Sequence, residues 1–239
     1  MKIKLKIPQK TDYPENIFLS IDGLEGCASA YYQTNPLLRH FFIKRLKKIV
    51  RIIPQRPYQR ILDVGTGIGF FLPTLSLIGE KVVALDNTSI VEAVRYMLAK
   101  RDISNVEVYQ ADIKKIPFDS ESFDLIIATS VLEHVKDLES AFTELKRVLK
   151  KEGELIIGYP IEGKLIVFLR KIESYLRPNL NKVVSQELEA NSERGHLSNY
   201  LEIKNQAEKY FNIEENVFLK ALGLLKIYEI LGLKNKRNI

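Results

Sequence analysis

The sequence predicts an α/β protein with a doubly wound, mostly parallel sheet and helices on both faces. Three observations support this fold class. Short apolar runs alternate with helical periodicity between residues 57 and 160, as in successive strand–helix–strand units. The runs are continuously apolar, which is typical of parallel strands buried on both faces. The first run, "RILDVG", leads directly into a glycine-rich turn.

The elements follow one another in the order that this fold requires. Ser89 and Glu92 have the spacing of a capping box, which predicts a helix from there to about Lys100. Asp137 can cap a later helix, because apolar side chains recur at helical spacing after it. Five strands are expected in this region, at residues 60–65, 81–86, 106–112, 123–130 and 153–159.

The flanking segments complete the predicted organisation. In the last segment we expect a helix at 201–210 and a strand at 211–219. Residues 221–233 are apolar and fit a helix as well as a strand, which leaves the far edge of the sheet open. The four segments are an N-terminal helical cap at 1–56, a core at 57–160, a helical insertion at 161–200 and a C-terminal completion of the core at 201–239.

Residues 37–53 predict a helix that is apolar on one side and basic on the other. The expected arrangement packs its Phe and Ile side chains on the core and leaves Lys in solvent. Peripheral contact with an anionic membrane surface and contact with RNA phosphates are the alternatives. The basic residues concerned are Lys44, Arg45, Lys47, Lys48 and Arg51.

Composition limits the class of protein. An apolar fraction of 46% and a charged fraction of 28% are those of a folded soluble chain. The single cysteine excludes a disulfide within the chain, and the N-terminus lacks the apolar core of a signal peptide, so a cytoplasmic location is expected. The three histidines are scattered without other ligands at metal-binding spacing, and we expect no metal. A net charge of +6 permits an anionic partner without identifying one.

The turn Gly65-x-Gly67-x-Gly69 can bring backbone close to a ligand, because glycine has no Cβ and adopts positive φ readily. A dinucleotide fingerprint requires a third glycine where this sequence has Phe70, and the sequence has no Gly-Lys-Ser/Thr of a phosphate loop. Asp63 places a carboxylate beside the turn. That charge disfavours a pyrophosphate and favours a ligand with an ammonium or sulfonium group.

Two more aspartates end expected strands. Asp86 ends the second strand, where it can accept hydrogen bonds from both hydroxyls of a ribose. Asp112 ends the third strand, where a carboxylate can meet an adenine amino group. Together with Asp63, these residues describe a site for a cationic amino acid joined to an adenosine.

The aspartates and glycines lie in five ordered blocks between residues 62 and 160: "LDVGTGIG", "ALD", "QAD", "FDLIIATSVLEHV" and "LKRVLKKEGELIIGYP". In these blocks the chain closely resembles the class I S-adenosylmethionine-dependent methyltransferases. The "SVLEHV" variant is most like the group that acts on small molecules and lipids. The resemblance implies a Rossmann-like methyltransferase sheet whose sixth and seventh strands form an antiparallel hairpin. It also implies S-adenosyl-L-methionine as cofactor and S-adenosyl-L-homocysteine as product.

By position, the resemblance assigns Asp63 and the glycine turn to the methionine portion, and Asp86 to the ribose. It assigns Asp112 with its neighbours to the adenine, and the end of the fourth strand to the sulfonium. Asp63 as a plain cap of the turn and Asp86 as an ordinary loop acid are the alternatives. The implied cofactor-binding residues are Asp63, Gly65, Thr66, Gly67, Gly69, Asp86, Asn87, Ala111, Asp112, Ile113, Thr129 and Ser130.

Methyl transfer from a sulfonium is an in-line displacement that depends mainly on alignment, so no elaborate catalytic signature is required. The candidate catalytic residues are His196 and Tyr200 in "ERGHLSNY", where related methyltransferases often carry a Gly-His or His-x-Tyr element, and His134 after the fourth strand. A surface loop or a helix start is the ordinary alternative for each histidine. Tyr31 and Tyr32 are expected either in a lid over the cofactor or as anchors of the N-terminal segment.

We therefore expect a methyltransferase acting on an oxygen or nitrogen, with carbon as a further option, of a small-molecule or lipid-like acceptor. Apolar residues 165–169 fit either an acceptor pocket or the core of the cap. The sequence lacks the Pro-Pro element of adenine-amine methyltransferases and the nucleophilic Cys of cytosine C5 enzymes at the required places. An RNA or protein methyltransferase and a non-catalytic S-adenosylmethionine-binding regulatory module are the alternatives. The chain is expected to be a monomer or a homodimer.

Overall fold

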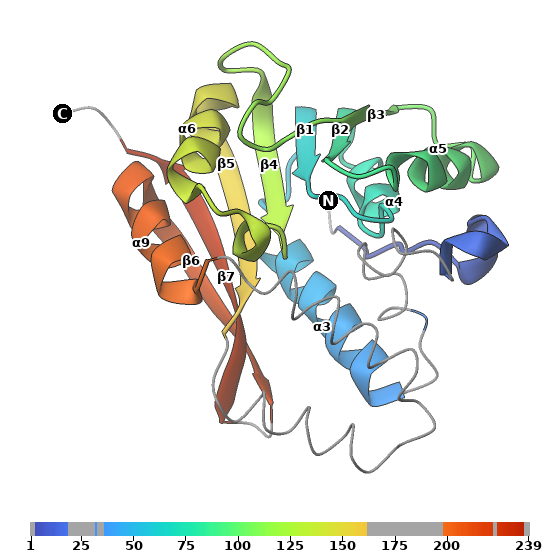
Figure 1. Ribbon diagram of the computed structural model, residues 1–239, viewed down its shortest axis with the longest axis horizontal. Coiled ribbons are helices and arrows are strands. Elements are labelled where there is room, and N and C mark those ends of the chain that lie inside the picture. The colour runs from blue at the N-terminus through green and yellow to red at the C-terminus, as the bar shows by residue number, and fades with distance from the viewer. Residues whose placement is uncertain (1–2, 19–31, 33–35, 162–197, 222–223, 237–239) are drawn as a thin grey trace.

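A seven-stranded sheet forms the centre of the computed structural model, which describes residues 3–18, 32, 36–161, 198–221 and 224–236 (Figure 1). The strand order is β3-β2-β1-β4-β5-β7-β6. β1 to β5 are parallel, whereas β7 is antiparallel to both of its neighbours. The strands are β1 (Tyr58–Val64), β2 (Gly79–Asp86), β3 (Val106–Gln110), β4 (Phe123–Thr129), β5 (Leu149–Pro160), β6 (Phe211–Ala221) and β7 (Leu225–Asn235).

Helices cover both faces of the sheet, as the sequence predicts (Figure 1). α6 and α9 lie on one face, and α3, α4 and α5 lie on the other. Neighbouring residues of β1 show the two layers, because Ile61 packs in one apolar cluster and Leu62 in the other. The described helices are α3 (Pro36–Ile52), α4 (Leu72–Leu75), α5 (Val91–Lys100), α6 (Leu138–Val148) and α9 (Tyr200–Tyr210), with 3-10 turns η1 (Lys10–Asp12), η2 (Glu15–Phe18) and η3 (Leu132–His134).

The two helix starts predicted from capping residues have different outcomes. Asp137 is the N-cap of α6, and its carboxylate accepts a hydrogen bond from the Ser140 amide at 3.0 Å. The capping box predicted for α5 is wrong, because Ile90 occupies the N-cap with helical backbone and no side chain caps it. The carboxylate of Glu92 forms an ion pair with Arg95 instead of reaching back to the helix start.

Residues 225–235 form a strand, which resolves the choice that the sequence left open between helix and strand. β7 pairs with β5 on one side and with β6 on the other. Ile230 and Leu231 enter opposite apolar clusters, so both faces of the strand are buried. This double burial explains why its sequence shows no alternation of polar and apolar residues.

α3 follows the predicted amphipathic arrangement with one exception. Lys44, Lys47 and Arg51 are exposed, and Leu46 and Ile49 are buried in the core. Arg45, which the sequence analysis grouped with the solvated basic residues, is only 6% exposed. No helix among the described residues is long and apolar enough to cross a membrane.

A buried carboxylate joins β7 to its surroundings. Glu229 is 2% exposed and accepts hydrogen bonds from the Tyr159 hydroxyl at 3.0 Å and the Asn216 amide at 3.0 Å. The Lys204 ammonium of α9 donates a third bond to it at 3.1 Å. The three donors compensate for the loss of hydration that burial imposes on this charge.

Replacing Glu229 with Gln is expected to lower the free energy of unfolding by about 1–3 kcal/mol, because a donor amide would then face groups that also donate. Urea unfolding followed by circular dichroism measures the change. The matched control is Glu214→Gln on an exposed position of β6, with an expected change below about 0.5 kcal/mol. Equal effects of the two substitutions would contradict a stabilising role for the buried carboxylate.

Candidate functional site

The glycine turn after β1 adopts the backbone conformation that only glycine takes without strain. Gly65, Gly67 and Gly69 have φ values of 66°, 53° and 72°. A Cβ on Gly65 would lie 2.5 Å from a methyl carbon of Val131, and a Cβ on Gly69 would lie 2.8 Å from Leu72. A side chain at Gly65 would therefore displace Val131, which follows β4, and one at Gly69 would displace Leu72 of α4.

Asp86 connects the turn to the end of β2. Its carboxylate accepts hydrogen bonds from the Gly67 amide at 2.8 Å and from the Thr88 amide and hydroxyl at 3.1 and 2.8 Å. The side chain is 7% exposed, so these bonds hold it in one orientation. Each carboxylate oxygen has two lone pairs, so Oδ1, which accepts both bonds from Thr88, is filled, whereas Oδ2 keeps acceptor capacity for a hydroxyl group of a ligand.

Asp63 is the second buried carboxylate of the site, with 5% of its surface exposed. It accepts a hydrogen bond from the Thr66 hydroxyl at 2.7 Å. Burial raises the pKa of Asp63 to about 7; the Thr66 hydrogen bond lowers it, and the negative charge of Asp86 raises it further. A ligand cation placed here would favour the ionised form of Asp63.

The end of β3 lies beside Asp86. The Ala111 amide donates to the Asp86 carbonyl at 2.9 Å, and Ile113 is buried. β3 ends at Gln110, so Asp112 begins the following turn instead of closing the strand. Its carboxylate accepts from the Lys114 amide at 2.9 Å and is about half exposed, at 48%.

The residues that follow β4 complete the edge of the site. Ser130 has a left-handed backbone with φ of 56°, and its amide donates to the Gly158 carbonyl at 2.7 Å. The Ser130 hydroxyl accepts from Nη1 of Arg45 at 2.6 Å and lies 2.9 Å from the Tyr228 hydroxyl. Non-glycine residues with positive φ cost about 1–3 kcal/mol and cluster at functional sites.

Carboxyl ends of neighbouring parallel strands bring most of the predicted cofactor residues together. The turn after β1, Asp86 after β2 and Ser130 after β4 are joined by the contacts above. Asn87 is exposed at this edge, and its carbonyl accepts from Gln110 at 3.3 Å. Thr129 ends β4 opposite Gly158 of β5.

The predicted catalytic residues are less closely grouped. His134 is exposed in η3, and Tyr200 begins α9, where it packs partly buried against the cluster beneath α6. His196 and the apolar residues 165–169 lie outside the described residues. Arg45 and Tyr228 were missed by the sequence analysis, although Arg45 occurs three residues after Phe42 and four before Ile49, on the apolar side of α3.

The N-terminal segment packs against the glycine turn. The Tyr13 hydroxyl donates to the Ile68 carbonyl at 2.8 Å. Tyr32 donates to the Pro8 carbonyl at 2.9 Å, and its ring centre lies 5.5 Å from that of Phe70. Tyr32 thus takes the anchoring role that was one of its two expected roles, and Tyr31 lies outside the described residues.

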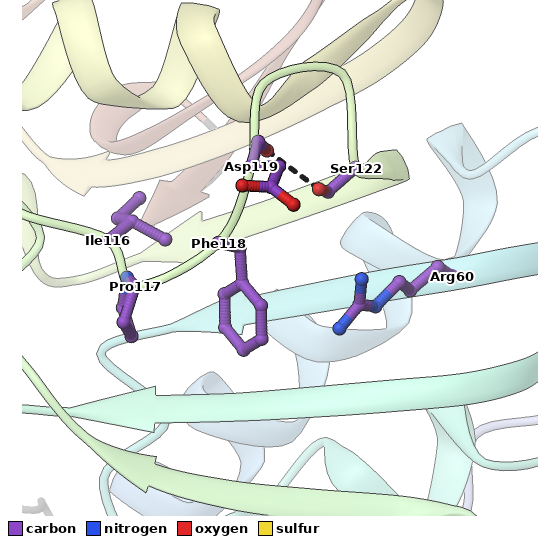
Figure 2. A pocket seen from close by; sticks show the side chains of 6 residues that line it. All are labelled: Arg60, Ile116, Pro117, Phe118, Asp119 and Ser122. Atoms are coloured by element: carbon purple, nitrogen blue, oxygen red, sulfur yellow. Dashed lines mark hydrogen bonds between the residues drawn. The ribbon is translucent and has the colours of Figure 1, made fainter.

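A second feature of the surface lies away from the glycine turn. Figure 2 shows Arg60 and Phe118 among the residues that line a pocket at the amino end of β1. Its volume is about 480 Å³. The Arg60 guanidinium lies 4.8 Å from the Phe118 ring centre and 4.9 Å from that of Phe123. Because the glycine turn follows the opposite end of β1, this pocket is separate from the candidate cofactor site.

The fold is of the doubly wound class, in which ligands bind at the carboxyl ends of the parallel strands, where the carboxylate-flanked turn lies. Residues 62–157 match the family described as a methyltransferase domain. A demethylmenaquinone methyltransferase from Clavibacter sepedonicus is 32% identical over 169 residues, which are 68% of this chain and 68% of that protein. The chain belongs to the class I S-adenosylmethionine-dependent methyltransferases.

Other relatives agree with this family. The ubiquinone/menaquinone biosynthesis C-methyltransferase of Vibrio parahaemolyticus is 32% identical over 143 residues, or 56% of this chain. The chain spans 55% of the length of that relative. The N-methyltransferase NodS of Bradyrhizobium japonicum, solved with S-adenosyl-L-homocysteine, has the same fold with a TM-score of 0.64 at 15% identity, covering 93% of this chain and 96% of NodS.

Asp63→Asn is expected to become more stable relative to the wild type as pH rises. The pKa of Asp63 in the folded protein, about 7, lies above its ordinary 3.8, so the folded state keeps a proton that the unfolded chain releases. Stability from this group is therefore greatest below about pH 4 and is lost as pH rises to about 7.

The expected gain of the variant over the wild type between about pH 5 and about pH 8 is on the order of 2 kcal/mol. Urea unfolding of both proteins without ligand at the two pH values measures it. Asp119→Asn removes an exposed carboxylate and is the matched control for the loss of one negative charge. A constant difference between Asp63→Asn and wild type would rule out the raised pKa.

Proposed function

We propose that this chain transfers a methyl group from S-adenosylmethionine to a ring carbon of a small, lipophilic quinol-like acceptor. The observation that carries the cofactor part is the pair of buried carboxylates, Asp63 and Asp86, on either side of the glycine turn. The acceptor part is supported by two relatives about one third identical, one named as a ubiquinone/menaquinone biosynthesis C-methyltransferase and the other as a demethylmenaquinone methyltransferase.

The residues at the turn fit the chemistry of this cofactor. Asp63 would pair with the ammonium of the methionine portion, and the positive φ of the glycines lets the backbone turn beside it. Asp86, already oriented by Gly67 and Thr88, would accept from a ribose hydroxyl through Oδ2. Residues 111–113 would border the adenine, with Ile113 as an apolar surface.

When bound, S-adenosylmethionine supplies a methyl group on a positively charged sulfur, which is already activated toward displacement. The protein then has to align the acceptor and exclude water. Thr129 and Ser130, at the carboxyl end of β4, would face the reacting groups. We propose His196, Tyr200 and His134 as the groups that could take up a proton.

Turnover is tested with S-adenosylmethionine labelled in its methyl group and demethylmenaquinol as acceptor. The expected result is label in the quinol, carried on a ring carbon as determined by mass spectrometry and NMR. Protein that has been heat-denatured is the blank. Cofactor binding without label transfer to demethylmenaquinol or to lipid extracts would favour the non-catalytic binding module over the enzyme.

Asp86→Ala is expected to weaken S-adenosyl-L-homocysteine binding at least about tenfold, because a charge-assisted hydrogen bond contributes about 1.5–3 kcal/mol. Titration calorimetry measures the dissociation constant. Asp119→Ala, an exposed aspartate in the loop before β4, is the control with unchanged affinity. Unchanged affinity in Asp86→Ala itself would remove the ribose assignment.

A further inference from the structure

Arg45 of α3 is a charged side chain inside the apolar side of its helix. It is 6% exposed, whereas its neighbour Lys44 is exposed. Its guanidinium carbon lies 5.1 Å from the ring centre of Phe42 and 5.1 Å from that of Tyr228. Because the free energy cost of burying a cation is large, aromatic faces and hydrogen bonds must offset part of it.

The guanidinium points to the end of β4. Nη1 donates to the Ser130 hydroxyl at 2.6 Å, and that hydroxyl lies 2.9 Å from the hydroxyl of Tyr228. The Tyr228 ring lies close over Gly158 of β5, because a Cβ added to Gly158 would be 2.8 Å from the Tyr228 hydroxyl oxygen. Three side chains, from α3, from the residue after β4 and from β7, thus form one connected polar group.

This group lies next to the candidate reaction centre. Ser130 precedes Val131, and Val131 is the residue in direct contact with Gly65 of the glycine turn. Ser130 also carries one of the few positive φ values outside glycine among the described residues. The positive charge of Arg45 is therefore one hydrogen bond away from Ser130, which is next in sequence to the residue that contacts the glycine turn.

We propose that Arg45, with Ser130 and Tyr228, binds an ionised oxygen of the methyl acceptor. This inference rests on the proposed function and narrows its substrate class to phenols and enols that react as their oxyanions. A guanidinium presents five N–H donors in a planar fork, a geometry that suits oxyanions better than neutral groups. Its effect is strengthened where water is excluded.

The reaction consistent with this site balances without a further reactant. The acceptor oxygen loses its proton to solvent and is held as phenolate by Arg45. Electrons move from the oxygen through the ring, the ring carbon forms a bond to the methyl carbon, and the pair of the breaking S–CH3 bond stays on the sulfur. The ring carbon then releases its proton to solvent, which restores the aromatic phenolate.

A chromogenic phenol tests the site without the natural acceptor. 4-Nitrophenol ionises near neutral pH and its phenolate is yellow, so absorbance reports the ionisation of the bound dye. With protein saturated with S-adenosyl-L-homocysteine, the pKa of the bound dye is expected to fall by at least about one unit below that of the free dye, a tenfold preference for the phenolate.

Arg45→Met is expected to abolish this shift, and Arg45→Lys, which keeps the charge without the fork, to retain part of it. Arg51→Met, on the exposed side of the same helix, is the matched control and should leave the shift intact. Thermal unfolding checks that each variant is folded, and Arg45→Lys serves as the test variant should Arg45→Met unfold. An equal shift in wild type and in the folded variants, or no binding of the dye to wild type, would overturn the proposal.

Methylation of demethylmenaquinol provides a second, separate readout. In Arg45→Met, the acidic limb of the pH profile of kcat is expected to move to higher pH, because the acceptor is harder to ionise without the guanidinium. The affinity for S-adenosyl-L-homocysteine should stay within about twofold, which separates this role from cofactor binding. If the wild-type protein shifts the pKa of the dye but methylates no quinol, the result counts against the proposed function alone. If Arg45→Met is active and its pH profile of kcat is that of the wild type, the result counts against the role of Arg45.

Discussion

The site depends on the burial of two carboxylates at one edge of the sheet. Asp63 and Asp86 stand at the ends of adjacent strands, and each loses most of its hydration there. Hydrogen bonds from Thr66, Gly67 and Thr88 replace part of that hydration. The remaining cost appears in the pKa of Asp63, which burial and the neighbouring Asp86 raise to about 7. A cationic ligand would compensate for the lost hydration of the two carboxylates. Their burial, which is unfavourable in the free protein, therefore favours binding of a cation.

Close packing around the glycine turn gives the site with the two carboxylates a defined shape. Gly65 contacts Val131 so closely that the loops after β1 and β4 must keep a fixed separation. The left-handed backbone at Ser130 stores strain at the same place. The sheet holds both loops, since β1 and β4 are paired along their length. A ligand at this edge therefore binds to a preformed surface, which can align it without a rearrangement of the two loops.

Opposite charges reach this edge from different parts of the chain. The parallel core supplies the negative carboxylates that suit a cationic cofactor. The N-terminal helix α3 and the last strand β7 supply Arg45 and Tyr228, which suit an anionic acceptor. Separate origins allow the acceptor side to change while the cofactor side stays the same, as is typical of folds that host many activities.

The sequence alone determined the five parallel strands, the glycine turn and the adjacent aspartates, because these depend on local patterns of burial and backbone freedom. Only the tertiary structure decided that residues 225–235 form a strand, since both of their faces are buried and their partners are distant in sequence. It also decided that Ile90 replaces Ser89 at the start of α5 and that Arg45 is buried. A lone arginine on a helix has no local signature of its partners. The Ser130 hydroxyl that receives its hydrogen bond comes from 85 residues away.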